Sequence, residues 1–145
     1  LEACLRLHPD CDVLIGAAAV SDYRPVETRP SKRKRTPGPW MLELVPTKDI
    51  LAELGPGKGE RVHVGFALES ERLLENAIEK LRAKRLDLIV ANPVEALGAF
   101  GATYCLLGAD GAVRELGSLR KDELARALLD AIEALPRYRT CFKTV

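Results

Sequence analysis

The sequence predicts an α/β fold, a three-layer unit in which helices cover both faces of a mostly parallel sheet. Three short apolar runs carry this prediction: DVLIGAAA at 12–19, RVHVGFA at 61–67 and LDLIVA at 86–91. Each run is too short for a typical helix and has the composition of a strand that is buried on both faces. A helical pattern between the last two runs indicates a strand–helix–strand crossover, which makes the two strands parallel.

The first half of the chain supplies shorter elements. Residues 1–7 have apolar residues at helical spacing but no start signal, so they read as the end of a helix. WMLELV at 40–45 is a predicted short strand, 48–54 is a brief helix that ends at Gly55 and Pro56, and 56–60 is a loop. The crossover helix covers 71–84 and has its apolar stripe at Leu74, Ala77, Ile78 and Leu81.

The second half ends with a hairpin and a helix. Residues 103–108 and 112–116 form a predicted antiparallel pair at the sheet edge, because Asp110-Gly111 supplies the positive φ angles of a tight turn. Ser118 is expected to cap the last helix, which stops before Pro136. Its apolar stripe comprises Leu124, Leu128, Ala131, Ile132 and Leu135. Residues 137–145 show no usable pattern, and we expect 1–145 to form one domain.

Composition excludes several classes of protein. The 22 Lys and Arg balance 21 Asp and Glu, so the net charge of +1 gives no field that would favour nucleic acid or an anionic membrane. No apolar run approaches the length of a membrane span, and no secretory signal is present, so we expect a soluble, cytoplasmic protein. The four cysteines are far apart and form no C-x-x-C pair, which favours free thiols over a metal site or disulfides.

The carboxyl ends of the parallel strands are where an open α/β sheet binds ligands. Asp22 follows the first strand, and Phe66 and Asn92 end the other two. On local sequence alone, a turn residue that ends the strand is the favoured interpretation of Asp22. Phe66 could be core packing, and Gly65 beside it would also allow a flat ring close to the backbone. From the residues alone, these alternatives stay open.

Two groups of cations could bind an anion. Arg29 and the run Lys32 to Arg35 place five positive charges in seven residues, so the segment should be exposed and would be ordered by a phosphate-rich ligand. Lys80 and Lys84 are neighbours on one face of the crossover helix and flank its apolar stripe. A solvated surface explains both groups equally well, and a nucleic-acid patch is a weaker alternative for the first.

Ordered motifs give the sequence a family resemblance. GAAAVSDYRP at 16–25, KRKR at 32–35, KDILAELG at 48–55, VGFALES at 64–70 and KRLDLIVAN at 84–92 resemble phosphopantothenoylcysteine synthetase in order and spacing. No dinucleotide fingerprint, P-loop or hydrolase signature competes with this resemblance. The resemblance implies a Rossmann-like domain with a flap and dimerisation arm.

The resemblance also implies a reaction and its components. Members of the family use CTP with Mg²⁺ to convert the carboxylate of phosphopantothenate into an acyl-cytidylate, from which the amine of cysteine displaces CMP. The family is usually the carboxyl half of a bifunctional flavoprotein, and FMN, which belongs to the other half, is not expected in this chain. A homodimer is expected, or a higher oligomer if the domain is fused to the decarboxylase half.

Site residues are carried over by position. Lys32 aligns with the catalytic lysine of a mobile flap, where it would stabilise the charge that develops at the α-phosphate. Ala18, Ala19 and Asp22 would bind phosphopantothenate. The nucleotide-binding positions are Gly16, Ala17, Ala18, Asp22, Lys32, Lys48, Asp49, Ile50, Leu51, Phe66, Lys80 and Lys84.

The chain departs from the family pattern in places. Its flap reads Lys-Arg-Lys-Arg at 32–35, the segment before the second helix reads Thr47-Lys48-Asp49-Ile50, and the third strand ends in Asn92-Pro93-Val94. The family's first strand and Gly-rich turn have no counterpart before Leu1. We therefore expect the 145 residues to bind nucleotide better than they catalyse, and a non-catalytic nucleotide-binding or dimerisation module is the alternative function.

Overall fold

The structure is a computed structural model that describes residues 1–35, 37–94 and 102–141, without the side chains of 139–141. The chain divides into two compact units. The first, Leu1–Ala17 with Ile50–Val145, is called the sheet unit here. The second, Ala18–Asp49, is called the arm and is inserted between the first and second strands of the sheet.

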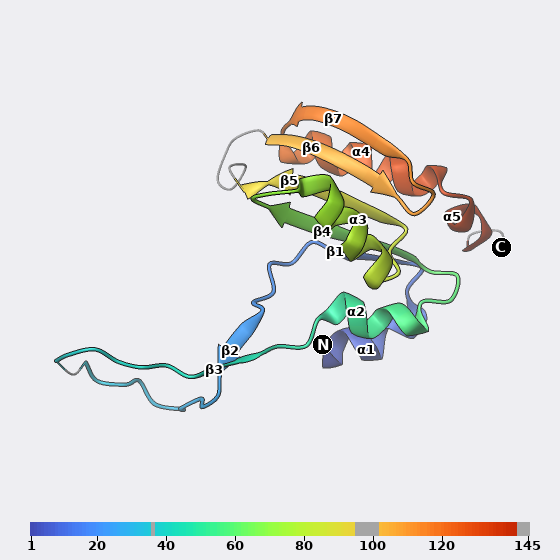
Figure 1. Cartoon of the computed structure of the whole chain (residues 1–145). Coiled ribbons are helices and arrows are strands. Elements are labelled where there is room, and N and C mark those ends of the chain that lie inside the picture. Colours follow the sequence, from blue (N-terminus) through green and yellow to red (C-terminus); the bar gives the residue numbers. More distant parts are fainter. Residues whose placement is uncertain (36, 95–101, 142–145) are drawn as a thin grey trace. The chain divides into compact units, whose positions relative to one another are not determined.

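The sheet unit is built on five strands in the order β1-β4-β5-β6-β7 (Figure 1). Their bounds are β1 Val13–Gly16, β4 Val62–Glu69, β5 Leu88–Pro93, β6 Ala102–Gly108 and β7 Val113–Leu119. β1 pairs with β4, and β4 with β5, in parallel. β5 pairs with β6, and β6 with β7, in antiparallel orientation. The predicted parallel crossover and edge hairpin are confirmed.

Helices cover both faces of this sheet, so the predicted three layers are confirmed. One face packs on α4, Lys121–Ala134, through a core that includes Val64, Val90 and Leu128. The other face packs on α3, Leu73–Ala83, through Ala77, Leu81 and Ile89. The remaining helices of the sheet unit are α1 Glu2–Leu7, η1 His8–Asp10, α2 Ile50–Leu54, η2 Gly55–Gly57 and α5 Pro136–Cys141.

Several sequence predictions were wrong in detail. The first strand covers only Val13–Gly16, and Ile15 is 41% exposed because β1 is an edge strand of the five-stranded sheet. In α3, Leu74 is 41% exposed, and Leu73 packs on the core instead. Ser118 lies in β7, opposite Thr103, so it does not cap α4.

The two turns around the hairpin also correct the sequence analysis. Only Gly111 of the Asp-Gly pair has a positive φ, 87°, while the carboxylate of Asp110 accepts a hydrogen bond from the Ala112 N–H at 2.9 Å. The residue that precedes α4 is Arg120, and the carboxylate of Glu123 accepts its backbone N–H at 2.8 Å. A carboxylate in the first turn thus satisfies a free N–H group at the start of the helix.

The arm contains a two-stranded antiparallel sheet, β2 Tyr23–Pro25 with β3 Leu44–Pro46. The predicted strand at 40–45 was therefore placed too early, although Val26 N–H still donates to Glu43 O at 3.1 Å beyond the ladder. At the base of the arm, the backbone N–H of Thr47 donates to Asp22 O at 2.8 Å, and its hydroxyl donates to Ser21 O at 2.5 Å. These two hydrogen bonds join the residue after β3 to the residues before β2.

Candidate functional site

The carboxyl ends of β1, β4 and β5 form one edge of the sheet, where the sequence analysis expects a ligand. A pocket of about 600 Å³ opens there on the α4 side. It brings Phe66 and Asn92 together with Ala17, so the expected grouping of these residues is confirmed. Phe66 does not end its strand, however, because β4 continues three residues further, to Glu69. The other lining residues are Ile15, Tyr104, Lys121, Leu124, Ala125, Leu128 and Leu129. The pocket is mostly apolar, with an amide and an ammonium group at its wall.

Glycines bring α2 against the strands at the same edge. The Cβ that Gly16 lacks would lie 2.7 Å from Leu51 Cδ1, so a larger residue at 16 would force this leucine to shift away from the end of β1. The predicted positions Gly16, Ile50 and Leu51 therefore come together. The space beside Gly65 is filled by Leu86, whose Cδ1 would lie 2.5 Å from an added Cβ. The idea that Gly65 leaves room for a flat ligand was wrong.

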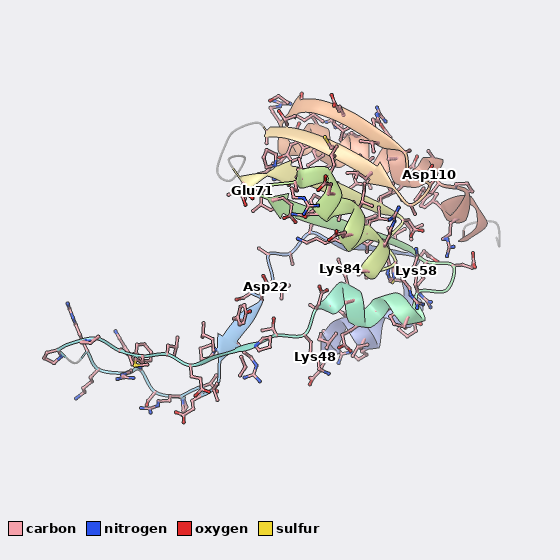
Figure 2. The ribbon with its side chains drawn as sticks, in the orientation of Figure 1. Asp22, Lys48, Lys58, Glu71, Lys84 and Asp110 are labelled. Carbon is pink, nitrogen blue, oxygen red and sulfur yellow. The ribbon has the colours of Figure 1, made fainter. Side chains whose placement is uncertain are left out.

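The two helical lysines of the sequence analysis lie in different surroundings. Lys80 Nζ is 2.5 Å from Glu69 Oε1, where β4 ends. Lys84 directly follows α3, whose last turn returns the chain to the amino end of β5. Figure 2 shows Glu71 and Lys84 beyond opposite ends of α3. The structure therefore places Lys80, more than Lys84, beside the carboxyl end of β4.

The other predicted site residues belong to the arm: Ala18, Ala19, Asp22, Lys32, Lys48 and Asp49. Asp22 uses its backbone carbonyl to accept a hydrogen bond from Thr47, and its side chain is exposed. Lys32 is exposed within the basic run. The arm thus carries the carboxylate of Asp22 and the ammonium groups of Lys32 and Lys48 at exposed positions.

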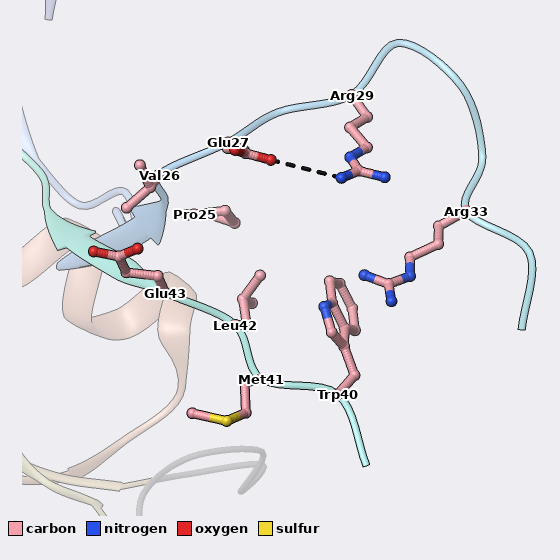
Figure 3. Close-up of a pocket in the computed structure, with 9 residues that line it drawn as sticks. All are labelled: Pro25, Val26, Glu27, Arg29, Arg33, Trp40, Met41, Leu42 and Glu43. Atoms are coloured by element: carbon pink, nitrogen blue, oxygen red, sulfur yellow. Dashed lines mark ion pairs between the residues drawn. The ribbon is translucent and has the colours of Figure 1, made fainter. Parts of the chain in front are cut away.

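A second pocket, of about 430 Å³, lies within the arm itself (Figure 3). Arg33 stacks over the ring of Trp40 with its guanidinium carbon 4.3 Å from the ring centroid, and Arg29 pairs with Glu27 at 3.7 Å. The walls also include Pro25, Val26, Met41, Leu42 and Glu43. Part of the basic run is therefore engaged by an aromatic ring and an acid within the arm itself.

Two residues that the sequence analysis missed complete the surroundings of Lys80. Glu69 is the last residue of β4, and Asn76 Nδ2 donates to its Oε2 at 3.0 Å. Asn76 and Lys80 are four apart on α3, the spacing that places two side chains on one helix face. The spacing of Asn76 and Lys80 is visible in the sequence. The cluster could still not be predicted from it, because the sequence did not show that β4 continues to Glu69.

A buried polar network at the opposite edge was also missed. His63, fully buried in β4, is joined to His8 of η1 by a 2.8 Å contact between their Nε2 atoms. Asp87 Oδ2 accepts the backbone N–H of His63 at 2.7 Å and pairs with Lys58 at 2.6 Å. Arg137 Nε lies 3.8 Å from Asp87 Oδ1. These contacts tie η1, the loop before β4, β5 and α5 together.

Burial governs the protonation of the two histidines. Desolvation, with the positive charges of His8, Lys58 and Arg61, lowers the pKa of His63 to about 4, and the charge of Asp87 opposes this only in part. Desolvation and Arg61 also lower the pKa of His8. A short contact between two ring nitrogens needs one donor and one acceptor, so it suits the neutral pair. Both histidines are therefore neutral at neutral pH.

In the part of the chain that the structure describes, no helix is long and apolar enough to cross a membrane. Within the same residues, Cys4, Cys11 and Cys105 are free thiols; the side chain of Cys141 lies outside them. Burial and the charge of Glu115 raise the pKa of Cys105. These three cysteines contribute no disulfide to either unit.

Comparison with known proteins identifies the family. The family model described as the DNA/pantothenate metabolism flavoprotein C-terminal domain matches residues 1–135. The coenzyme A biosynthesis bifunctional protein CoaBC of Bacillus subtilis is 42% identical over 140 residues, which are 94% of this chain and 34% of that protein. CoaBC of Mycobacterium tuberculosis is 36% identical over 90% of this chain and 35% of its own length. The chain spans about a third of the length of these relatives.

Solved structures agree with this assignment. The crystal structure of the C-terminal domain of a CoaBC protein is 36% identical and matches with a TM-score of 0.73, over 91% of this chain and 58% of that one. A Cab2 mutant in complex with phosphopantothenate-cysteine shares the fold at a TM-score of 0.60 and 19% identity, over 88% and 45% of the two chains. The chain therefore belongs to the family of DNA/pantothenate metabolism flavoprotein C-terminal domains.

Proposed function

We propose that this chain is a ligase domain of coenzyme A biosynthesis that joins cysteine to 4′-phosphopantothenate. The observation that carries the proposal is the 42% identity to CoaBC of Bacillus subtilis over 94% of the chain, because that protein's name assigns it to coenzyme A biosynthesis. The neighbour solved with phosphopantothenate-cysteine shares only the fold, but its ligand is the product that this proposal requires.

The proposed reaction has two steps and uses CTP. The carboxylate of phosphopantothenate attacks the α-phosphorus, which forms an acyl-cytidylate and releases diphosphate. The amine of cysteine then attacks the acyl carbon; a C–N bond forms, the bond to CMP breaks and the amine loses a proton. Activation is needed because a carboxylate is a poor acyl donor, whereas CMP is a good leaving group.

Residues of both units take roles in this proposal. Gly16 and Ala17 lie at the carboxyl end of β1, with Leu51 of α2 packed on Gly16 and Phe66 of β4 in the pocket beside Ala17, and we expect the nucleotide to bind at this edge of the sheet. From the arm, Lys32 would stabilise negative charge on the α-phosphate. The other proposed nucleotide contacts are Ala18, Asp22, Lys48, Asp49, Ile50, Lys80 and Lys84, and Ala18, Ala19 and Asp22 would also contact phosphopantothenate.

Magnesium would neutralise phosphate charge and orient the triphosphate. Among the described residues, no three His, Cys, Asp or Glu side chains form a group that could hold a metal ion. Mg²⁺ commonly binds to substrate phosphates, one or two carboxylates and water. In this proposal the ion arrives with the nucleotide, and Asp22 is one of the exposed carboxylates of the arm that could assist it.

Binding of Mg-CTP should raise the melting temperature by roughly 5 to 10 °C at a concentration of 100 times the Kd, because a ligand that binds only the folded chain stabilises it. ATP, GTP and UTP should give smaller shifts at the same concentration. Asp22→Ala and Lys80→Ala should each reduce the CTP shift. Thermal melting followed by circular dichroism measures all of these, and a wild-type chain that shows no shift with any nucleotide contradicts the proposal.

Turnover separates the ligase from the alternative, a non-catalytic nucleotide-binding module. Mass spectrometry of a mixture with CTP, Mg²⁺, phosphopantothenate and cysteine should detect phosphopantothenoylcysteine and CMP. Lys32→Ala should lower the rate about 100-fold, the usual cost of one transition-state charge contact. Lys34→Ala, a charge two residues away, should leave it within about twofold. A CTP-selective shift without any product assigns the chain to the module.

We further propose that two copies associate through the arm. Trp40, Met41 and Leu42 are 60%, 93% and 48% exposed, and Tyr23 and Leu44 in the strands are 57% and 49% exposed. A two-stranded ribbon is barely stable alone, and several large apolar side chains exposed on one short ribbon favour a protein interface. The same patch on a second copy supplies the matching apolar chemistry.

Met41→Glu should therefore weaken dimerisation by at least about tenfold, because it places a charge in the apolar centre of the interface. Sedimentation velocity over a concentration series measures the change. Ser31→Glu, which adds the same charge at an exposed position elsewhere in the arm, is the matched control and should leave the dimer intact. A monomeric wild type, or equal dimerisation of both variants, excludes the arm as the interface.

A further inference from the structure

Three side chains form a fixed cluster where β4 passes into α3. The carboxylate of Glu69 has both oxygens engaged: Oε1 lies 2.5 Å from Lys80 Nζ, and Oε2 lies 3.0 Å from Asn76 Nδ2. Asn76 Nδ2 also donates to the carbonyl of Glu71 at 3.1 Å. Because both amide hydrogens have acceptors, Asn76 ties the carboxylate to the segment that leads into the helix.

The two partners of the ion pair differ in exposure. The side chain of Glu69 is only 14% exposed, whereas that of Lys80 is 41% exposed. Burial tends to raise the pKa of Glu69, but hydrogen bonds from Lys80 and Asn76 and the charge of Lys80 outweigh it and hold the pKa below its usual value. The carboxylate is therefore a fixed anion on the inner side of a cation that faces solvent.

An ammonium group has three N–H donors, and Glu69 accepts only one of them. The exposed side of Lys80 can still donate to an anion. A free lysine would lose rotamer entropy when it bound a phosphate, but here the ion pair has already ordered much of the side chain. Such preorganisation strengthens binding without adding a contact to the ligand.

We propose that Glu69, braced by Asn76, is a positioning residue that holds the Lys80 ammonium ready for the phosphate oxygens of the nucleotide. This role rests on the proposed function, because it needs a nucleotide at Lys80. The cluster is built for it: β4 supplies the acid at its carboxyl end, and α3 supplies the amide and the cation at positions four apart.

The direction in which Glu69→Gln changes the Kd for Mg-CTP tests this role. The variant keeps the shape of the side chain and removes one negative charge near the anion. If Glu69 only competed with phosphate for Lys80, Mg-CTP would bind more tightly. Positioning predicts weaker binding, by about three- to tenfold in Kd, the cost of ordering one long side chain. Isothermal titration calorimetry gives the Kd, and melting without nucleotide confirms that the variant is folded.

Glu79→Gln is the matched control. Glu79 is exposed on α3 and adjacent to Lys80 in sequence, so its replacement removes the same charge near the site without touching the cluster. Its Kd should be unchanged or slightly lower. Asn76→Ala keeps the carboxylate but removes its brace, and it should weaken binding by an intermediate factor; it also serves as the second variant if Glu69→Gln does not fold.

A double-mutant cycle completes the test. In a Lys80→Ala background, Glu69→Gln should have no further effect on the Kd, because the cation that it positions is gone. Equal or tighter binding by Glu69→Gln in the wild-type background overturns the role, and so does an undiminished loss in the Lys80→Ala background. A wild-type chain that does not bind CTP overturns the proposed function itself, which is a different result.

Discussion

Asp87→Ala should lower the free energy of unfolding by about 3 to 5 kcal/mol, the usual cost of removing one member of a buried ion pair. Asp87 and Lys58 are each only 12% exposed, and their charged atoms lie 2.6 Å apart. The alanine variant leaves the Lys58 ammonium without its carboxylate and the His63 N–H without its acceptor. Urea unfolding followed by circular dichroism measures the loss.

Two further substitutions show where the loss comes from. Asp87→Asn keeps an oxygen for the His63 N–H and removes only the charge, so it should cost less than the alanine variant. Asp110→Ala removes an exposed aspartate that accepts one hydrogen bond in the β6–β7 turn, and it should cost about 1 kcal/mol or less. Similar losses for Asp87→Ala and Asp110→Ala would show that the network at the amino edge contributes little.

Acid should destabilise the protein between pH 6.5 and pH 4 through His63. Its pKa falls from 6.5 to about 4 on folding, so over this range the unfolded chain binds a proton that the folded chain does not. Stability is then fully present above pH 6.5 and falls as the pH falls. Between pH 7.5 and pH 5 the loss should be about 2 kcal/mol.

The groups that face His63 set the direction of this effect. His8 comes from η1, Lys58 and Arg61 come from the segment before β4, and Asp87 precedes β5. His63→Asn removes the titration but keeps a polar side chain, so urea midpoints from pH 7.5 to pH 5 should fall much less than in the wild type. Equal falls in the two proteins would assign the acid sensitivity to other groups.

Much of the sheet unit could be predicted from the sequence because burial leaves a clear pattern. The run at 86–91 reads as a buried strand, and Leu88 to Ala91 are indeed all buried. The pattern failed where a strand had only one partner: β1 is half exposed, so its apolar run overstated its length and burial. The strand predicted at 40–45 was misplaced for a related reason, because Trp40 and Met41 are apolar residues that the arm leaves exposed.

The sequence predicted where the candidate site lies in the sheet better than it predicted which side chains contact each other there. Parallel strands place Phe66 and Asn92 at one edge, and the structure brings both into one pocket. The partner of Lys80 could not be predicted from the helix alone, since Glu69 comes from a strand that continues two residues beyond the predicted run. The His8–His63 contact joins residues that are 55 positions apart in the sequence, and a local sequence pattern cannot predict such a contact.

The close packing of Leu51 on Gly16 bears on how far the length of the arm can vary. The sheet unit is left at Ala17 and re-entered at Ile50, and the missing Cβ of Gly16 keeps these two junctions close together. The arm is thus a closed loop with fixed, neighbouring ends. Loop closure costs about 0.6 kcal/mol for each doubling of length. Insertions and deletions in 18–49 would therefore be cheap for the sheet unit, which leaves the arm free to diverge in length while the strands beneath it stay constant.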